Sequence, residues 1–134
     1  MITLSFNETI RYKESTTGIG IPVQLACGQQ AFWTDAKVDP GAEVCLFKNE
    51  EGRKLGLIVE QGEPITLGTL TGSIEAFGHW VTLQTGYLIF YSLVYFAKYP
   101  NLPRNILGRR GWMRNIKLAI VDNDNLLYLS AYDE

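Results

Sequence analysis

Apolar and polar residues alternate along several short segments of this chain, and alternation with a period of two is typical of half-buried β-strands. The clearest pair covers residues 21–26 and 31–38, with a turn at Gly28 between them. From residue 57 onwards the pattern returns, broken at intervals by glycine, asparagine and aspartate. It predicts strands over residues 57–60, 64–67, 73–83, 87–96, 106–107, 116–121 and 126–129, the last two forming a closing hairpin.

The N-terminal residues 1–20 are predicted to be a strand and loop extension. Residues 2–6 alternate and predict a first strand at a sheet edge, and the polar residues 7–20 predict a loop or a ragged hairpin. No repeat, linker or low-complexity segment divides the chain. We therefore expect a single domain over residues 1–134.

Two short helical segments interrupt the β pattern. Residues 49–54 predict one or two helical turns, with Asn49 as the N-cap and Gly56 as the stop. Residues 109–115 suit a second short helix. Many short strands spaced by turns, with two minor helices, indicate an all-β domain that is closed or nearly closed into a barrel.

The composition is that of a soluble globular protein and offers no footprint for nucleic acid. Hydrophobic residues make up 46% of the 134 residues and charged residues 19%. Twelve Lys and Arg residues against 14 Asp and Glu residues give a formal net charge of -2. The local basic run Arg104, Arg109, Arg110 and Arg114 indicates a solvated face or ion pairs more often than a phosphate site.

Candidate metal ligands are few. Cys27 and Cys45 form no CxxC motif and have no paired histidine, so both are interpreted as small buried hydrophobes. His79 is the single histidine and is interpreted as a surface or packed residue. We therefore expect no metal and no cofactor.

The apolar segments do not predict a membrane protein. Residues 87–97 are about half the ~20 residues that a membrane helix needs, and residues 1–11 lack the apolar core of a signal peptide. We expect a soluble, cytoplasmic protein with no membrane partner.

One segment has the form of a catalytic element. The apolar strand ending at Val38 delivers Asp39 to a sharp turn, which continues through Pro40, Gly41, Ala42 and Glu43. At Gly41 the absence of a Cβ lets the backbone pass close to the carboxylate. Taken alone, Asp-Pro-Gly is a common β-turn, and an unrelated β-domain with such a turn is the plain alternative.

Two glycine-containing segments follow Asp39 in the chain. Residues 66–74 form a hairpin whose tip, Gly68, Thr69, Leu70, Thr71 and Gly72, has an apolar residue at its apex. Later, Ile106 and Leu107 precede Gly108 and Arg109. Each motif alone is weak, but their order along the chain is fairly specific.

In this order, the three segments resemble the retropepsin family of single-domain aspartic proteases, over about residues 21–129. Residues 39–43 are similar to its catalytic Asp-Thr/Ser-Gly-Ala loop, residues 66–74 to its flap, and residues 106–109 to its Ile/Leu-Leu-Gly-Arg motif. The resemblance implies a homodimer in which two Asp39 carboxylates activate a water to hydrolyse a peptide or protein substrate. It also implies that the Gly41 N–H holds the Asp39 carboxylate, and that Glu43 pairs with Arg109.

Pro40 departs from the family pattern, in which a Thr or Ser at this position joins a hydrogen-bond lattice across the dimer axis. Proline supplies neither the hydroxyl nor the N–H. Two hypotheses follow: a homodimeric aspartic endopeptidase, or a catalytically inactive dimerisation or peptide-binding domain on the same fold.

Overall fold

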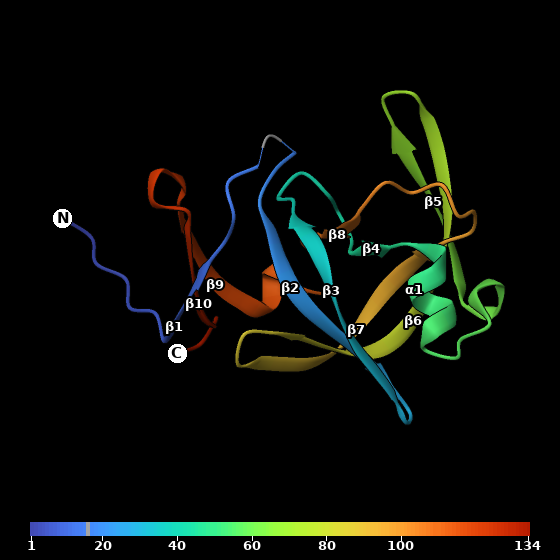
Figure 1. Ribbon diagram of the computed structural model, residues 1–134, viewed down its shortest axis with the longest axis horizontal. Helices are drawn as coiled ribbons and strands as arrows, with labels where there is room; N and C mark the ends of the chain where they lie inside the picture. Colours follow the sequence, from blue (N-terminus) through green and yellow to red (C-terminus); the bar gives the residue numbers. More distant parts are fainter. Residues whose placement is uncertain (16) are drawn as a thin grey trace.

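The computed structural model describes residues 1–15 and 17–134, and most of this part of the chain is β-structure (Figure 1). Its strands follow one another with short connections between them. They are β1 (Glu8–Arg11), β2 (Gly20–Cys27), β3 (Gln30–Val38), β4 (Leu46–Phe47), β5 (Glu63–Thr69), β6 (Gly72–Thr85), β7 (Leu88–Ala97), β8 (Asn105–Leu107), β9 (Ile116–Val121) and β10 (Leu126–Ala131).

Six strands close into a barrel. They pair in the order β2-β3-β8-β4-β7-β6, and β6 pairs again with β2 from Gln24↔Gln84 to Ala26↔Thr82, which joins the two ends of the sheet. The β3–β8 and β4–β7 pairs are parallel, and the other pairs of the ring are antiparallel. β5 extends the sheet from β6 outside the ring. The prediction of a closed all-β domain is confirmed.

The strand expected at residues 2–6 is wrong, because the first strand is β1. β1 pairs with β10, with Glu8 opposite Leu129, in a small sheet of order β1-β10-β9 near both chain ends (Figure 1). Ile2 and Leu4 alternate as a strand would, but they are exposed. The loop expected over residues 7–20 thus contains β1, and residue 16 of that loop lies outside the described residues.

Alternate residues of the barrel strands are buried, most of them in one main apolar cluster. On β2, Ile21, Val23 and Leu25 have no exposed surface, whereas the residues between them are more accessible. Leu127 of β10 belongs to the same apolar cluster, so the small sheet and the barrel share a core. Trp112, the largest fully buried side chain, also joins this cluster.

Helix α1 (Asn49–Lys54) forms where it is predicted and ends just before Gly56, whose φ is 80°. Asn49 is not the N-cap, however, but the first helical residue. Its Nδ2 donates to the carbonyls of Ala97, at 2.9 Å, and Lys98, at 3.1 Å. A buried amide needs hydrogen-bond partners, and here the end of β7 supplies them instead of the helix terminus.

The remaining helical turns are 3₁₀ turns: η1 (Val59–Gln61), η2 (Met113–Asn115) and η3 (Asp122–Asp124). The strand expected at residues 57–60 is wrong, because its second half belongs to η1 and its first half is irregular. The helix expected at residues 109–115 is reduced to η2. Gly111 has a φ of 96°, and a Cβ there would lie 2.8 Å from the Leu93 carbonyl oxygen. The chain therefore turns sharply against β7 instead of forming a helix.

Trp112→Phe should lower the free energy of unfolding by about 1–3 kcal/mol. It leaves a void, and it removes the indole N–H that donates to Thr85 Oγ1 at 2.9 Å in the core. Chemical denaturation followed by circular dichroism measures the change. Trp33→Phe is the matched control, since that side chain is 53% exposed. Equal losses in the two variants would contradict this description of the core.

Candidate active site

Asp39 directly follows β3, and its side chain lies outside the core. Buried Ala36 and Val38 anchor the end of the strand, and the alternation of side chains leaves Asp39 half-buried. The Asp39 N–H donates to the Leu107 carbonyl at 3.0 Å, which ties the end of β3 to β8. The end of β3 thus presents the Asp39 carboxylate at the surface of the barrel.

Residues 39–43, here called the Asp loop, orient this carboxylate through local hydrogen bonds. The Gly41 N–H donates to Asp39 Oδ1 at 2.9 Å, as the resemblance implies, and the Ala42 N–H donates to the Asp39 carbonyl at 3.1 Å. A Cβ at Gly41 would lie 3.2 Å from Asp39 Oδ1, so a larger residue would crowd the carboxylate. Pro40 is exposed.

Gly108 brings β8 into direct contact with the backbone behind the Asp loop. A Cβ on Gly108 would lie 2.1 Å from the Val44 carbonyl oxygen and 2.9 Å from that of Ala42, so only glycine fits. Just beyond it, the Arg109 N–H donates to the Ala42 carbonyl at 2.9 Å. The motif at residues 106–109 therefore packs against the backbone of the Asp loop and holds it in place.

The ion pair expected between Glu43 and Arg109 is wrong, because Arg110 forms it. Arg110 Nε lies 4.0 Å from Glu43 Oε1. A parallel bridge between Val44 and Arg110, and the Arg110 N–H donated to the Glu43 carbonyl, set these two residues side by side. The side chains are 73% and 69% exposed, so the pair contributes at most about 1 kcal/mol.

A cleft of about 470 Å³ opens beside Asp39. The Asp loop lines it together with β5, and Leu46, Ile65 and Ile106 add apolar surface. Sequence reasoning missed these three residues. Their convergence on Asp39 depends on the pairing of β4 with β7 and of β8 with β3, strands that are distant in the sequence. Asp39 therefore lies at the edge of a cleft with both polar and apolar walls.

The hairpin of β5 and β6 contains the residues predicted as a flap, and it projects from the barrel (Figure 1). Thr69 pairs with Gly72, which leaves Leu70 and Thr71 as a two-residue turn, with Leu70 fully exposed. Gly68 and Thr69 line the cleft with Asp39, whereas the tip residues Leu70, Thr71 and Gly72 do not.

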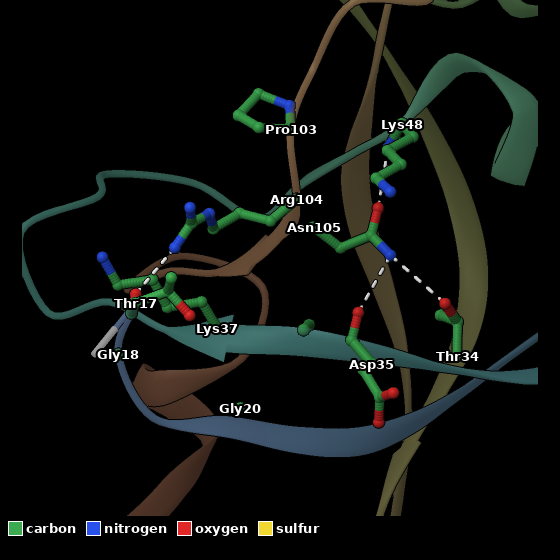
Figure 2. Close-up of a pocket in the computed structure, with 11 residues that line it drawn as sticks. Thr17, Gly18, Gly20, Thr34, Asp35, Lys37, Lys48, Pro103, Arg104 and Asn105 are labelled. Atoms are coloured by element: carbon green, nitrogen blue, oxygen red, sulfur yellow. Dashed lines mark hydrogen bonds between the residues drawn. The ribbon is translucent and has the colours of Figure 1, made fainter. Parts of the chain in front are cut away.

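The basic run of the sequence is divided between two places. Arg109, Arg110 and Arg114 line a cavity of about 330 Å³ beside Pro40 and Gly41. Arg104 lies in a different pocket, lined by β3 and the start of β8 (Figure 2).

Cys45 is buried against the support of the Asp loop. Its Sγ accepts from the Gly108 N–H at 3.4 Å and donates to the Arg110 carbonyl at 3.6 Å. Burial raises the pKa of this thiol to about 12, so it stays protonated at neutral pH. The interpretation as a buried hydrophobe is confirmed for Cys45, while Cys27 is only partly buried.

His79 is packed in the structure, as interpreted from the sequence. Its Nε2 lies 2.9 Å from the Val59 carbonyl oxygen, and its ring meets the edge of Phe96. Across residues 1–15 and 17–134, no group of three or more His, Cys, Asp or Glu side chains could hold a metal ion. Nor does this part of the chain contain a helix long and apolar enough to span a membrane.

Solved structures of aspartic proteases share this architecture. A retropepsin-like aspartic protease from Rickettsia conorii matches with a TM-score of 0.66 and 18% identity, over 92% of this chain and 99% of that chain. EIAV protease in complex with the inhibitor HBY-793 matches with a TM-score of 0.53 and 19% identity, over 67% and 80% of the two chains. The chain therefore has the retropepsin fold.

The likeness is one of structure. No model of a known protein family matches the sequence, and no curated protein is significantly similar to it.

Gly108→Ala should lower the free energy of unfolding by about 2 kcal/mol or more, because its Cβ would collide with backbone atoms that a rotamer change cannot move. Thermal unfolding measures the loss. Gly68→Ala is the matched control, since a Cβ there has no neighbour within 4 Å. A Gly108→Ala protein as stable as the control would contradict the close contact.

Proposed function

We propose that this protein is an aspartic endopeptidase that acts as a homodimer, with one Asp39 from each subunit in a shared site. The observation that carries the proposal is the position of Asp39, a half-buried carboxylate held by the Gly41 N–H at the edge of a cleft with polar and apolar walls. The fold shared with the two proteases adds support. Because each chain supplies a single such carboxylate, a second copy completes the pair.

The chemistry follows from the electrostatics of two neighbouring carboxylates. Two like charges at short range cannot both ionise readily, so the paired Asp39 side chains share a proton and titrate as a coupled pair. The ionised carboxylate takes a proton from a bound water as that water attacks the peptide carbonyl, while the protonated partner donates to the carbonyl oxygen. The Gly41 N–H keeps the carboxylate oriented throughout.

The cleft suits an extended peptide or protein substrate. β5 ends the strand order of its sheet, and in the described residues it pairs with β6 alone. Its other edge offers backbone N–H and carbonyl groups to a substrate strand. Ile65 and Leu67 provide apolar surface for the substrate side chains. Closure of the hairpin tip over the peptide would then exclude water from the reaction.

We expect Pro40 to affect the association of two subunits more than the conformation of the Asp loop. The Asp loop keeps its hydrogen bonds with proline present. What proline lacks is a hydroxyl and an N–H facing the partner. We therefore expect the active site to form in a dimer that associates more weakly than one with Thr or Ser at position 40. The alternative to be tested is a catalytically inactive domain.

Asp39→Asn should abolish peptide cleavage, because an amide can neither share the proton nor activate the water. Incubation of the dimeric protein with a mixed peptide library at mildly acidic and neutral pH, read by mass spectrometry, measures cleavage. Asp133→Asn, a change of an exposed carboxylate in the C-terminal tail, is the matched control and should cut as the unmodified protein does. Equal cleavage by the Asp39→Asn protein would exclude Asp39, and no cleavage by the unmodified dimer would favour the inactive domain.

Pro40→Thr should tighten the dimer by roughly tenfold or more, since two symmetry-related residues each regain donors worth about 1 kcal/mol net. Sedimentation equilibrium measures the dissociation constant. Pro100→Thr, in an exposed loop next to α1, is the control and should leave it unchanged. An unchanged or weaker dimer in the Pro40→Thr protein would argue against an interface at the Asp loop.

A further inference from the structure

A pocket of about 400 Å³ with a basic lining lies beside the end of β3 and the start of β8 (Figure 2). Its walls come from the end of β3, the segment that enters β8, and the residues just before β2. Three cationic side chains line it, Lys37, Lys48 and Arg104, against one carboxylate, that of Asp35. All of them belong to a single subunit.

The cations of this pocket are not neutralised by neighbours. Among the residues that the structure describes, the ion pairs within 4.0 Å are Lys54–Glu51, Lys98–Glu75 and Arg110–Glu43. Figure 2 shows Lys37 and Arg104 extending toward one end of the pocket, and the Asp35 carboxylate pointing away from both. The pocket therefore has a surplus of positive charge in a chain whose net charge is -2.

Lys37 and Arg104 are held in place by their surroundings. Arg104 donates from one guanidinium nitrogen to the Thr17 carbonyl at 2.6 Å, which leaves its other N–H groups free for a ligand. A Cβ on Gly18 would lie 2.7 Å from Lys37 Cε, so the backbone of Gly18 packs closely on the lysine stem. The two cations are thus partly ordered before any ligand binds, which lowers the entropic cost of binding.

The pocket and the Asp39 cleft use neighbouring positions of the same two strands. Lys37 precedes Asp39 by two residues, on the same side of β3, so the two lie about 7 Å apart along the strand. Lys37 pairs with Ile106, which lines the cleft, and Arg104 precedes Ile106 by two residues. An extended peptide rises about 3.3 Å per residue, so a peptide that runs along β3 past Asp39 would place a side chain about two residues from the cut bond beside Lys37.

We propose that this pocket binds the carboxylate of an aspartate or glutamate side chain of the peptide, and so makes Lys37 and Arg104 specificity-determining residues. The inference rests on the proposed function, because it takes the ligand to be the substrate. Arg104 offers N–H donors in the geometry that a carboxylate accepts, and Lys37 adds a point charge. A neutral glutamine of the same size would leave both cations without a counter-charge.

Binding to the Asp39→Asn protein tests the inference without cleavage. Short synthetic peptides of mixed sequence are retained on the immobilised protein, and the bound peptides are sequenced. We expect aspartate and glutamate to be enriched over asparagine and glutamine at one position. For a retained peptide, replacing that glutamate by glutamine should weaken binding by about tenfold, and this difference should shrink at high salt.

Single substitutions identify which side chains of the pocket recognise the negative charge of the peptide. Lys37→Met and Arg104→Met should each reduce the preference for glutamate over glutamine several-fold. Arg53→Met removes the same charge from an exposed position on α1 outside the pocket, and it should retain the full preference. A preference that persists in both pocket variants would overturn the inference.

Failure of the proposed function gives a different result from failure of this inference. If the unmodified protein cuts no peptide, but the Asp39→Asn protein retains acidic peptides through Lys37 and Arg104, the pocket stands and the catalysis fails. If peptides are cut with no preference for acidic residues, or if no peptide is retained, the assignment of this pocket is overturned.

Discussion

The site depends on one close contact, in which the backbone of Gly108 lies directly against the carbonyl of Val44. No residue with a Cβ fits there. Because the two backbones are this close, the Arg109 N–H can donate to the Ala42 carbonyl. β8 and the Asp loop are therefore a single packed unit. The orientation of the Asp39 carboxylate is consequently set by the barrel and by residues almost seventy positions later in the chain, and not by a local turn alone.

The fold is complete within one subunit, whereas the proposed chemistry is not. Pairing of β6 with β2 closes the barrel, and the apolar core needs no partner to bury it. Asp39 lies outside that core, beside the exposed Pro40. In the proposed dimer, changes at the Asp loop surface would therefore alter the association of two subunits without unfolding either, because the proposed interface and the core involve different atoms.

Charge around the cleft is arranged by strand register. Lys37 and Asp39 share a face of β3, while Ala36 and Val38 enter the core. Arg104 joins Lys37 because β8 pairs in parallel with β3, and Arg110 reaches Glu43 because the chain beyond β8 continues beside Val44. A shift of one residue in the pairing of two segments exchanges such partners. The sequence motif predicted an ion pair for Arg109, whereas the next residue, Arg110, forms it.

By itself, the sequence determined the all-β class, most of the barrel strands, helix α1, and the three segments that resemble a retropepsin. Period-two alternation and glycine turns are properties of short segments, so they can be recognised without knowledge of the fold. Only the tertiary structure decided that β1 forms at Glu8–Arg11 and not at residues 2–6, since residues 8–11 are mostly polar in sequence and form a strand by pairing with the edge of β10. Likewise, the helix expected at residues 109–115 is replaced by a sharp turn at Gly111 against β7, and the cleft and the cationic pocket exist because distant strands pair. These outcomes depend on which surfaces meet, and that information is not local to any segment.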